Sequence, residues 1–163
     1  MYISIVGVDH LRNGFCRAKL QAEQSIEESG LPWTVLRATE FHDLLMTVLQ
    51  RLSRAPAALV PRGSLLQPVD AGEVADRLVD LAMKPAAGRV RELGGPRVES
   101  MAELTRCYLT AARRSRAVIE VPVPARWAAG FGVGGHLLAH GDCGTVTFAD
   151  HVRARLTPDP DQR

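Results

Sequence analysis

Lys19 is the residue of this sequence whose type and position point most directly to chemistry. It follows Phe15 by four residues, in a stretch where Phe15, Ala18 and Ala22 recur at helical spacing. A helix with this spacing carries Lys19 near the boundary of its buried face, so the amine could reach the edge of a neighbouring sheet. In open α/β folds, ligands bind at the carboxyl edge of the parallel strands. The alternative is a solvated lysine with no role in binding.

The chain on both sides of Lys19 predicts a β-α-β unit. Residues 2–8 form a nearly continuous apolar run, which is typical of a strand buried on both faces. Asn13 can cap the helix, Gly30 and Pro32 end it, and a second buried strand begins at Trp33. Two such strands bridged by a helix form a right-handed unit of a parallel sheet. We expect the helix to turn Phe15, Ala18, Ala22 and Ile26 towards the core.

The remaining chain predicts further helices and strands, without an internal repeat. Asp70 with Glu73, and Ser100 with Glu103, have the spacing of a capping box at a helix start. A short helical segment is expected to begin at Pro124, and residues 130–144 are expected to form a glycine-rich loop. We expect helices over residues 44–52, 70–84, 100–114 and 147–156, and strands over residues 57–60, 64–69, 89–93 and 117–123.

Two further groups of residues have the types that bind phosphate or metal ions. Residues 130–135 satisfy the GxGxxG pattern, but a Trp-containing segment precedes them and no clear helix follows, so we favour a loop over a phosphate site. A metal could take ligands from a second group, but no other ligand cluster is evident, and we predict no metal site. The members of this second group are His136, His140, Asp142 and Cys143.

Polar residues also flank two of the predicted helices. The basic residues 113–116 lie at a helix C-terminus, where the helix dipole favours positive charge, so they do not indicate nucleic-acid binding. His42 and Asp43 are expected to cap the helix that follows them or to line the substrate side of a cleft.

The composition is that of an ordinary soluble globular protein. The chain has 163 residues, 46% of them hydrophobic and 23% charged, with a net charge of +2. This length suits one domain, and the slight charge gives no case for a nucleic-acid partner. The three cysteines have no paired spacing, which favours reduced thiols in the cytoplasm. No apolar run is long enough to span a bilayer, so we expect no membrane partner.

The first predicted strand begins directly after Met1. A buried parallel strand needs a neighbour on each side, because an open edge leaves backbone groups unpaired. We therefore expect either that part of the sheet is encoded upstream, so that this chain is N-terminally truncated, or that the edge of the first strand is covered in a homodimer.

Residues 2–10, 15–43 and 65–78 together resemble the second half of an atypical short-chain dehydrogenase/reductase of the NmrA-like, NAD(P)-binding family. The resemblance covers most of the chain and is strongest over residues 2–82. It implies that Lys19 corresponds to the lysine of a Tyr-x-x-x-Lys pattern, which holds the ribose hydroxyls of NAD(P). It also implies that Ala38, Thr39, Glu40 and Phe41 form the loop beside the nicotinamide ring, and that the substrate is a small carbonyl or quinone-like molecule.

The sequence departs from the family pattern at the position of the tyrosine. Phe15 stands there, and a phenyl ring has no hydroxyl with which to donate or accept a proton. His10, Cys16 or Glu40 could donate or accept the proton instead, but only in a different geometry. Ser4 is one candidate for the family's serine at the end of a strand, and Ile5 fits that register equally well. The glycine-rich phosphate turn of the family is missing from the first half of the chain.

We therefore predict an α/β fold, namely the C-terminal part of a Rossmann-like parallel sheet with flanking helices and a small cap region. The chain is expected to form one partial NAD(P)-binding domain, with the sheet core in residues 1–87 and a substrate or cap region in residues 88–163. Three functions stay open: an NAD(P)-dependent oxidoreductase that uses Lys19, a non-catalytic NAD(P)-sensing regulator, and an inactive remnant or interaction module.

Overall fold

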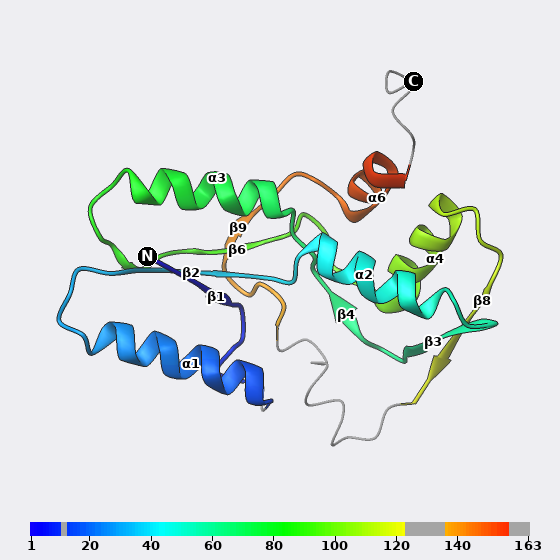
Figure 1. Ribbon diagram of the computed structural model, residues 1–163, viewed down its shortest axis with the longest axis horizontal. Coiled ribbons are helices and arrows are strands. Elements are labelled where there is room, and N and C mark those ends of the chain that lie inside the picture. The colour runs from blue at the N-terminus through cyan, green and yellow to red at the C-terminus, as the bar shows by residue number, and fades with distance from the viewer. Residues whose placement is uncertain (11–12, 123–135, 157–163) are drawn as a thin grey trace.

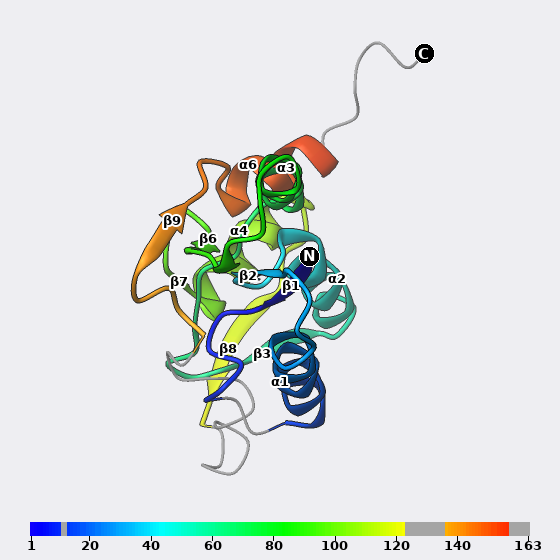
Figure 2. The same cartoon turned by 90° about the vertical axis from the view of Figure 1, so that its left-hand side faces the viewer.

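A parallel sheet with helices on both faces organises the chain, which confirms the predicted fold class. The computed structural model describes residues 1–10, 13–122 and 136–156. Helices α1 and α3 lie on opposite sides of β1 and β2 (Figure 1), and a view at right angles shows the same separation (Figure 2). The elements are β1 (Tyr2–Ile5), α1 (Gly14–Glu27), β2 (Thr34–Ala38), α2 (His42–Leu52), β3 (Ala57–Pro61), β4 (Leu65–Leu66), α3 (Ala71–Ala82), β5 (Gly88–Arg89), β6 (Glu92–Gly94), β7 (Glu99–Ser100), α4 (Met101–Ala111), β8 (Ala117–Val121), β9 (Gly141–Cys143) and α6 (Phe148–Leu156).

The main sheet has the strand order β1-β2-β6-β9, and every pairing in it is parallel. β5 also pairs with β2. The unit β1-α1-β2 is the one that the sequence predicts, with Ile5 opposite Ala38. In the described part of the chain, β1 has β2 as its strand partner and forms one end of the sheet. Two small sheets, β3 with β8 and β4 with β7, complete the strands.

Strand β9 lies inside the segment that we predicted as a glycine-rich loop, so that prediction is wrong for residues 141–143. Its sequence, Gly-Asp-Cys, has none of the β-branched or aromatic residues that mark strands. It is a strand because β6 lies beside it, with Leu93 opposite Asp142. β5, β6 and β9 all follow residue 87 and all join the main sheet, so the sheet extends into the region where we expected a cap.

Two apolar clusters hold the layers together. One lies between the sheet and α3 and includes Leu36, Ala38 and Val74. The other lies among α2, α4 and α6 and includes Leu49 and Leu104. The first cluster fixes the strands whose carboxyl ends form the site described below. None of the helices that the structure describes combines the length and the apolar character needed to cross a bilayer.

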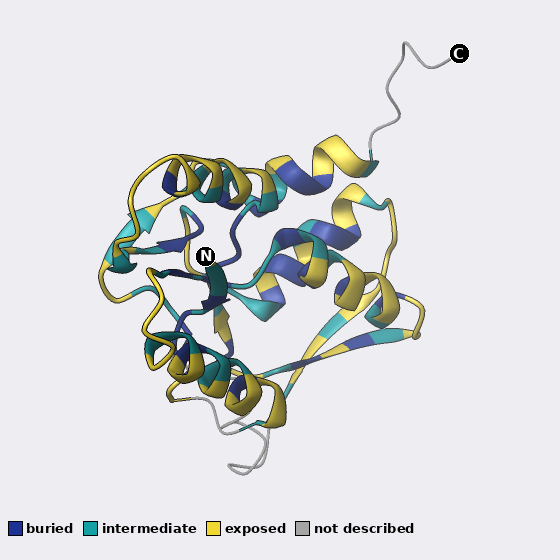
Figure 3. Ribbon diagram, turned by 60° about the vertical axis from the view of Figure 1, so that its left-hand side comes forward, coloured by how far each residue is buried: buried dark blue, intermediate teal, exposed yellow. Residues whose placement is uncertain are grey.

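Helix α1 begins and ends as predicted but turns a different face inward. The Asn13 side chain accepts a hydrogen bond from the Cys16 amide at 2.8 Å, and Gly30 has a positive φ of 70°. However, Phe15 is 66% exposed and Ala18 is also exposed, so the predicted apolar face is wrong at these positions. Cys16 and Glu23 are buried in their place, and much of this helix is exposed or half-buried in Figure 3.

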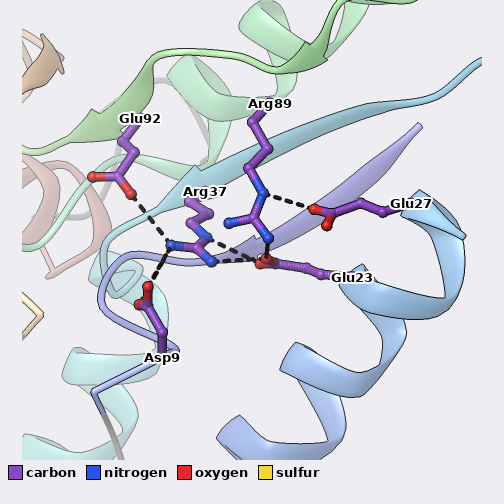
Figure 4. Close-up of polar contacts among 6 residues, drawn as sticks. All are labelled: Asp9, Glu23, Glu27, Arg37, Arg89 and Glu92. Carbon is purple, nitrogen blue, oxygen red and sulfur yellow. Dashed lines mark hydrogen bonds and ion pairs between the residues drawn. The ribbon is translucent and has the colours of Figure 1, made fainter.

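The charged residue Glu23 is buried on α1 because two arginines from the sheet neutralise it. Arg37 of β2 donates two hydrogen bonds to the Glu23 carboxylate, at 3.0 and 2.8 Å, and Arg89 of β5 lies 3.2 Å from it. Asp9 and Glu92 also lie within ion-pair distance of Arg37 (Figure 4). Burial opposes ionisation of Glu23, but the hydrogen bonds from Arg37 hold the pKa of its carboxyl below the ordinary value. A polar network thus fixes α1 on the sheet where apolar contacts were expected.

The two predicted capping boxes have different outcomes. Ser100 and Glu103 form the reciprocal pair of hydrogen bonds at the start of α4, as predicted. At the start of α3, the Asp70 side chain accepts from the amides of Gly72 and Glu73, but the Glu73 carboxylate does not return to the cap. It accepts hydrogen bonds from residues 145 and 146, and so ties the connection between β9 and α6 to α3.

Candidate functional site

A cavity of about 440 Å³ opens at the carboxyl ends of β1 and β2. Ligand pockets in α/β proteins typically lie at this edge of the sheet, and their volumes are roughly 300 to 1,000 Å³. The structure brings all the predicted cofactor residues to this cavity. It also brings Cys16, a candidate for the missing proton donor, and Ser4 and Ile5, the two candidates for the family serine. The lining comprises Ile3, Ser4, Ile5, Phe15, Cys16, Lys19, Ala38, Thr39, Glu40, Phe41, Leu44, Leu66 and His136.

Lys19 reaches the sheet, but its amine lies at the free side edge of β1 and not at the carboxyl edge that we expected. Its Nζ donates a hydrogen bond to the Ile3 carbonyl at 3.0 Å and lies 4.7 Å from the centre of the Tyr2 ring. Backbone groups alternate in direction along a strand, and the Val6 amide points to β2 by donating to the Ala38 carbonyl. The Ile3 carbonyl therefore points away from β2, and Lys19 covers part of the open edge of β1. The predicted homodimer through this edge stays a prediction.

Phe15 lies at the cavity beside Lys19, since residues four apart share a helix face. Its ring is 66% exposed and supplies an apolar surface but no proton. Ser4 and Ile5 both line the cavity, so position alone does not separate the two alternatives for the family serine. Ser4 is 4% exposed, and among the described residues its hydroxyl has no hydrogen-bond partner.

The loop after β2 is held in place by residues that the sequence did not single out. The Thr39 hydroxyl donates to the Gln67 carbonyl at 2.6 Å, and its amide donates to the Leu93 carbonyl at 3.0 Å. Phe41 forms a bridge with Val69. Thr39 is therefore a positioning residue, because its two hydrogen bonds tie this part of the cavity wall to two neighbouring segments.

Glu40 and His136 face each other at the cavity. Glu40 Oε1 lies 3.8 Å from His136 Nε2, with side-chain exposures of 18% and 9%. Burial raises the pKa of the Glu40 carboxyl, and the nearby imidazole opposes that shift. We considered His136 only as a metal ligand, because nothing in the sequence links it to a residue so far away in the chain.

The other candidates for the proton donor and for metal ligands lie in different places. Cys16 is buried in the cavity wall, whereas His10 is exposed and does not line the cavity. Asp142 pairs with Arg77 and Arg91, and His140 is exposed. In the described ranges, no three His, Cys, Asp or Glu side chains are grouped to hold a metal ion. Residues 124–127 and the GxGxxG pattern lie outside the described residues.

His42 and Asp43 neither cap α2 nor line the cavity, so both parts of that prediction are wrong. The cap position is Phe41, without a side-chain hydrogen bond. His42 is fully buried, and its Nε2–H donates to the Val146 carbonyl at 3.1 Å. Asp43 lies 3.1 Å from Arg155 and 3.4 Å from His151, both on α6. These two residues fasten α6 to α2.

No protein-family model matches the sequence, and no curated protein is significantly similar to it. Solved structures do match in fold. The chain has a Rossmann-like fold. An NADPH-dependent quinone oxidoreductase from Escherichia coli superposes with a TM-score of 0.73 at 14% identity, over 96% of this chain and 66% of that protein.

Two further matches bind related nucleotides. RMD from Pseudomonas aeruginosa, solved in complex with NADPH, gives a TM-score of 0.64 at 18% identity, over 95% of this chain and 64% of that protein. A dTDP-4-dehydrorhamnose reductase from Bacillus anthracis, in complex with NADP, gives 0.71 at 13% identity, over 94% and 63%. This chain spans less than two thirds of the length of each, and identities this low show the fold alone.

Proposed function

We propose that the cavity binds the nicotinamide and ribose end of NAD(P)H and that the protein serves the reduction of a small carbonyl or quinone-like compound, as NmrA-like reductases do. The observation that carries this proposal is the position of Lys19, which lines the cavity at the carboxyl ends of β1 and β2 and has its amine against the free side edge of β1. The proteins of similar fold that were solved with NADPH or NADP support it.

The residues present fit this part of the nucleotide. Lys19 supplies a cationic donor for ribose hydroxyls, and the mostly apolar wall suits a flat ring. The His136 Nε2 atom is buried, and it has no hydrogen-bond partner in the ranges described. It is therefore available to form a hydrogen bond with a bound ligand. When bound, a reduced nicotinamide supplies a hydride. The chain's own part is to hold the ribose at Lys19, to keep water from the ring, and to deliver a proton to the substrate.

Titration with NADPH and NADH, followed by nucleotide fluorescence, tests the binding. Lys19→Met should weaken the affinity about 10- to 100-fold, because a hydrogen bond to a charged group contributes roughly 1.5–3 kcal/mol. The matched control is Lys84→Met, which removes an exposed lysine just beyond α3. Equal affinity in the wild type and Lys19→Met would contradict the assignment of Lys19, and a folded chain that binds neither nucleotide would contradict the proposal itself.

A second candidate is a nucleotide-sensing regulator that binds NAD(P)H without turnover. Phe15 favours it, because the tyrosine position of the Tyr-x-x-x-Lys pattern holds no hydroxyl. Oxidation of bound NADPH with a carbonyl or quinone acceptor distinguishes the two functions. Saturable binding without oxidation, and without gain in Phe15→Tyr, would favour the regulator.

A further inference from the structure

The pair Glu40 and His136 is the part of the cavity that neither the fold nor the nucleotide explains. A carboxyl with 18% of its side chain exposed and an imidazole with 9% lie 3.8 Å apart at the cavity, and no arginine lines the cavity in the described part of the chain. Burying ionisable groups is unfavourable unless they are paired or bound to something. The imidazole Nε2 has no hydrogen-bond partner among the described residues, so it can accept or donate a proton.

One residue, Gln67, holds both Glu40 and the segment that follows His136. Its backbone amide donates to Glu40 Oε1 at 3.0 Å. Its side-chain oxygen accepts from the Leu138 amide at 3.0 Å, and its side-chain nitrogen donates to the Gly95 carbonyl at 2.8 Å. Gln67 is 6% exposed, so it is a rigid support. The described hydrogen bonds of the Glu40 side chain use Oε1 alone, and they leave Oε2 available to a ligand in the cavity.

The electrostatic surroundings allow the Glu40 carboxyl to hold a proton. The other ionisable side chains on the cavity wall are Cys16, Lys19 and His136. Burial raises the pKa of Glu40, and the charge of His136 lowers it to a smaller extent. A general acid is most effective when its pKa lies near the working pH, which for a carboxyl requires such a rise.

We propose that Glu40 is the proton donor of this site, in the place of the hydroxyl that is missing at Phe15, and that His136 returns a proton to it. This proposal rests on the proposed function. In the reduction of a carbonyl, the substrate carbon accepts a hydride, and the electrons of the C=O π bond move to oxygen. The O–H bond of Glu40 breaks, its proton joins the substrate oxygen, and an alcohol and the Glu40 carboxylate result. The His136 imidazolium then donates a proton to Glu40 and is reprotonated from water.

Infrared spectroscopy of the chain without nucleotide tests the donor directly. The wild type should show the carbonyl stretch of a protonated carboxyl above about pH 5.5, where an ordinary glutamate is ionised. The band should weaken in Glu40→Gln, which keeps an acceptor for the Gln67 amide, and the remainder should come from other carboxyls whose pKa burial raises, such as Glu99. The part of the band that comes from Glu40 should persist in Glu99→Gln. This control removes another carboxyl whose pKa is raised by burial, but Glu99 lies on β7 outside the cavity. In His136→Asn the pH at which half of the Glu40 band is lost should rise, since the positive charge that lowers the pKa of Glu40 is gone.

Reduction of benzaldehyde by NADPH provides the second readout. Glu40→Gln should lower kcat about 10²- to 10⁴-fold, the usual contribution of general acid catalysis. It should also remove the fall in rate with rising pH. An unchanged pH profile in Glu40→Gln, or a Glu40 that is ionised throughout that pH range, would overturn the proton-donor assignment. Failure of the proposed function is distinct, because the wild type would then not bind NADPH.

Discussion

Replacing Arg37 by Met should destabilise the protein through the glutamate that it leaves behind. Glu23 is fully buried, and Arg37 donates two hydrogen bonds to it from a side chain that is 11% exposed. Met is apolar and replaces the aliphatic part of the Arg37 side chain, so the packing around that part changes little. The main effect is that a buried carboxylate loses its principal partner and keeps only Arg89, at 3.2 Å.

The expected loss is about 3 kcal/mol in the free energy of unfolding. Removing one partner of a buried ion pair costs roughly 3–5 kcal/mol, and the Arg89 contact that remains places the value at the low end. For a chain of this size, each kcal/mol corresponds to about 2–4 °C in Tm, so the midpoint should fall by about 6–12 °C. Adding Glu23→Gln to Arg37→Met should restore part of the loss, because the uncompensated charge is gone.

Urea denaturation at two pH values measures both the loss and its cause. The pKa of Glu23 is lowered in the folded protein, so the stability that it contributes is present above its ordinary pKa, near 4.5, and is lost as the pH falls. The cost of Arg37→Met should therefore be largest near neutral pH and shrink in acid. The control, Arg153→Met, breaks an exposed pair with Asp150 on α6 and should leave the midpoint unchanged. A loss below about 1 kcal/mol at neutral pH would refute the reasoning, because Glu23 would then be effectively solvated.

Three further predictions concern the packing of the chain. Gly95→Ala should cost more than about 2 kcal/mol in a thermal melt, because a Cβ there would overlap the Pro68 carbonyl, whereas Gly14→Ala, with open space around it, should be neutral or stabilising. Burial lowers the pKa of His42, so the unfolded chain binds the extra proton there and His42 should make stability decline as the pH falls below about 6.5, whereas Glu40, whose pKa burial raises, contributes in the opposite direction; the same pH dependence of stability in the wild type and in His42→Gln between about pH 7 and 5 would contradict this. Glu73→Gln should cost about 2 kcal/mol and speed amide exchange at residues 145 and 146, and unchanged exchange there would show that the contact is dispensable.

The helix starts and the β-α-β unit could be predicted because local signals determine them. Asn13, Asp70 and Ser100 cap their helices with hydrogen bonds to amides two or three residues ahead, so the sequence contains the whole interaction. Lys19 could be placed at the sheet edge for the same reason, since the helix period fixes which face it shares.

The features that the sequence did not reveal depend on partners far along the chain. Glu73 has the spacing of a capping box, but the amides of residues 145 and 146 take its carboxylate. From the sequence alone, Glu23 is expected to be a solvated residue of the helix. It is buried because the fold places Arg37 and Arg89 beside it. Glu40 and His136 approach each other only because the segment before β9 packs against Gln67. No local pattern encodes such contacts.

The strand order has a consequence for how the protein is made. β1, α1 and β2 are close in sequence and can assemble as soon as they leave the ribosome, but β6 waits for β9, where Leu93 pairs with Asp142. Pairings between distant segments form slowly, because a long loop must close first. Until residues 141–143 have been synthesised, the growing chain presents the unpaired edge of β6, and such an edge can pair with other chains. Chaperones should thus bind the growing chain most strongly after β6 has been synthesised and before β9 pairs with it.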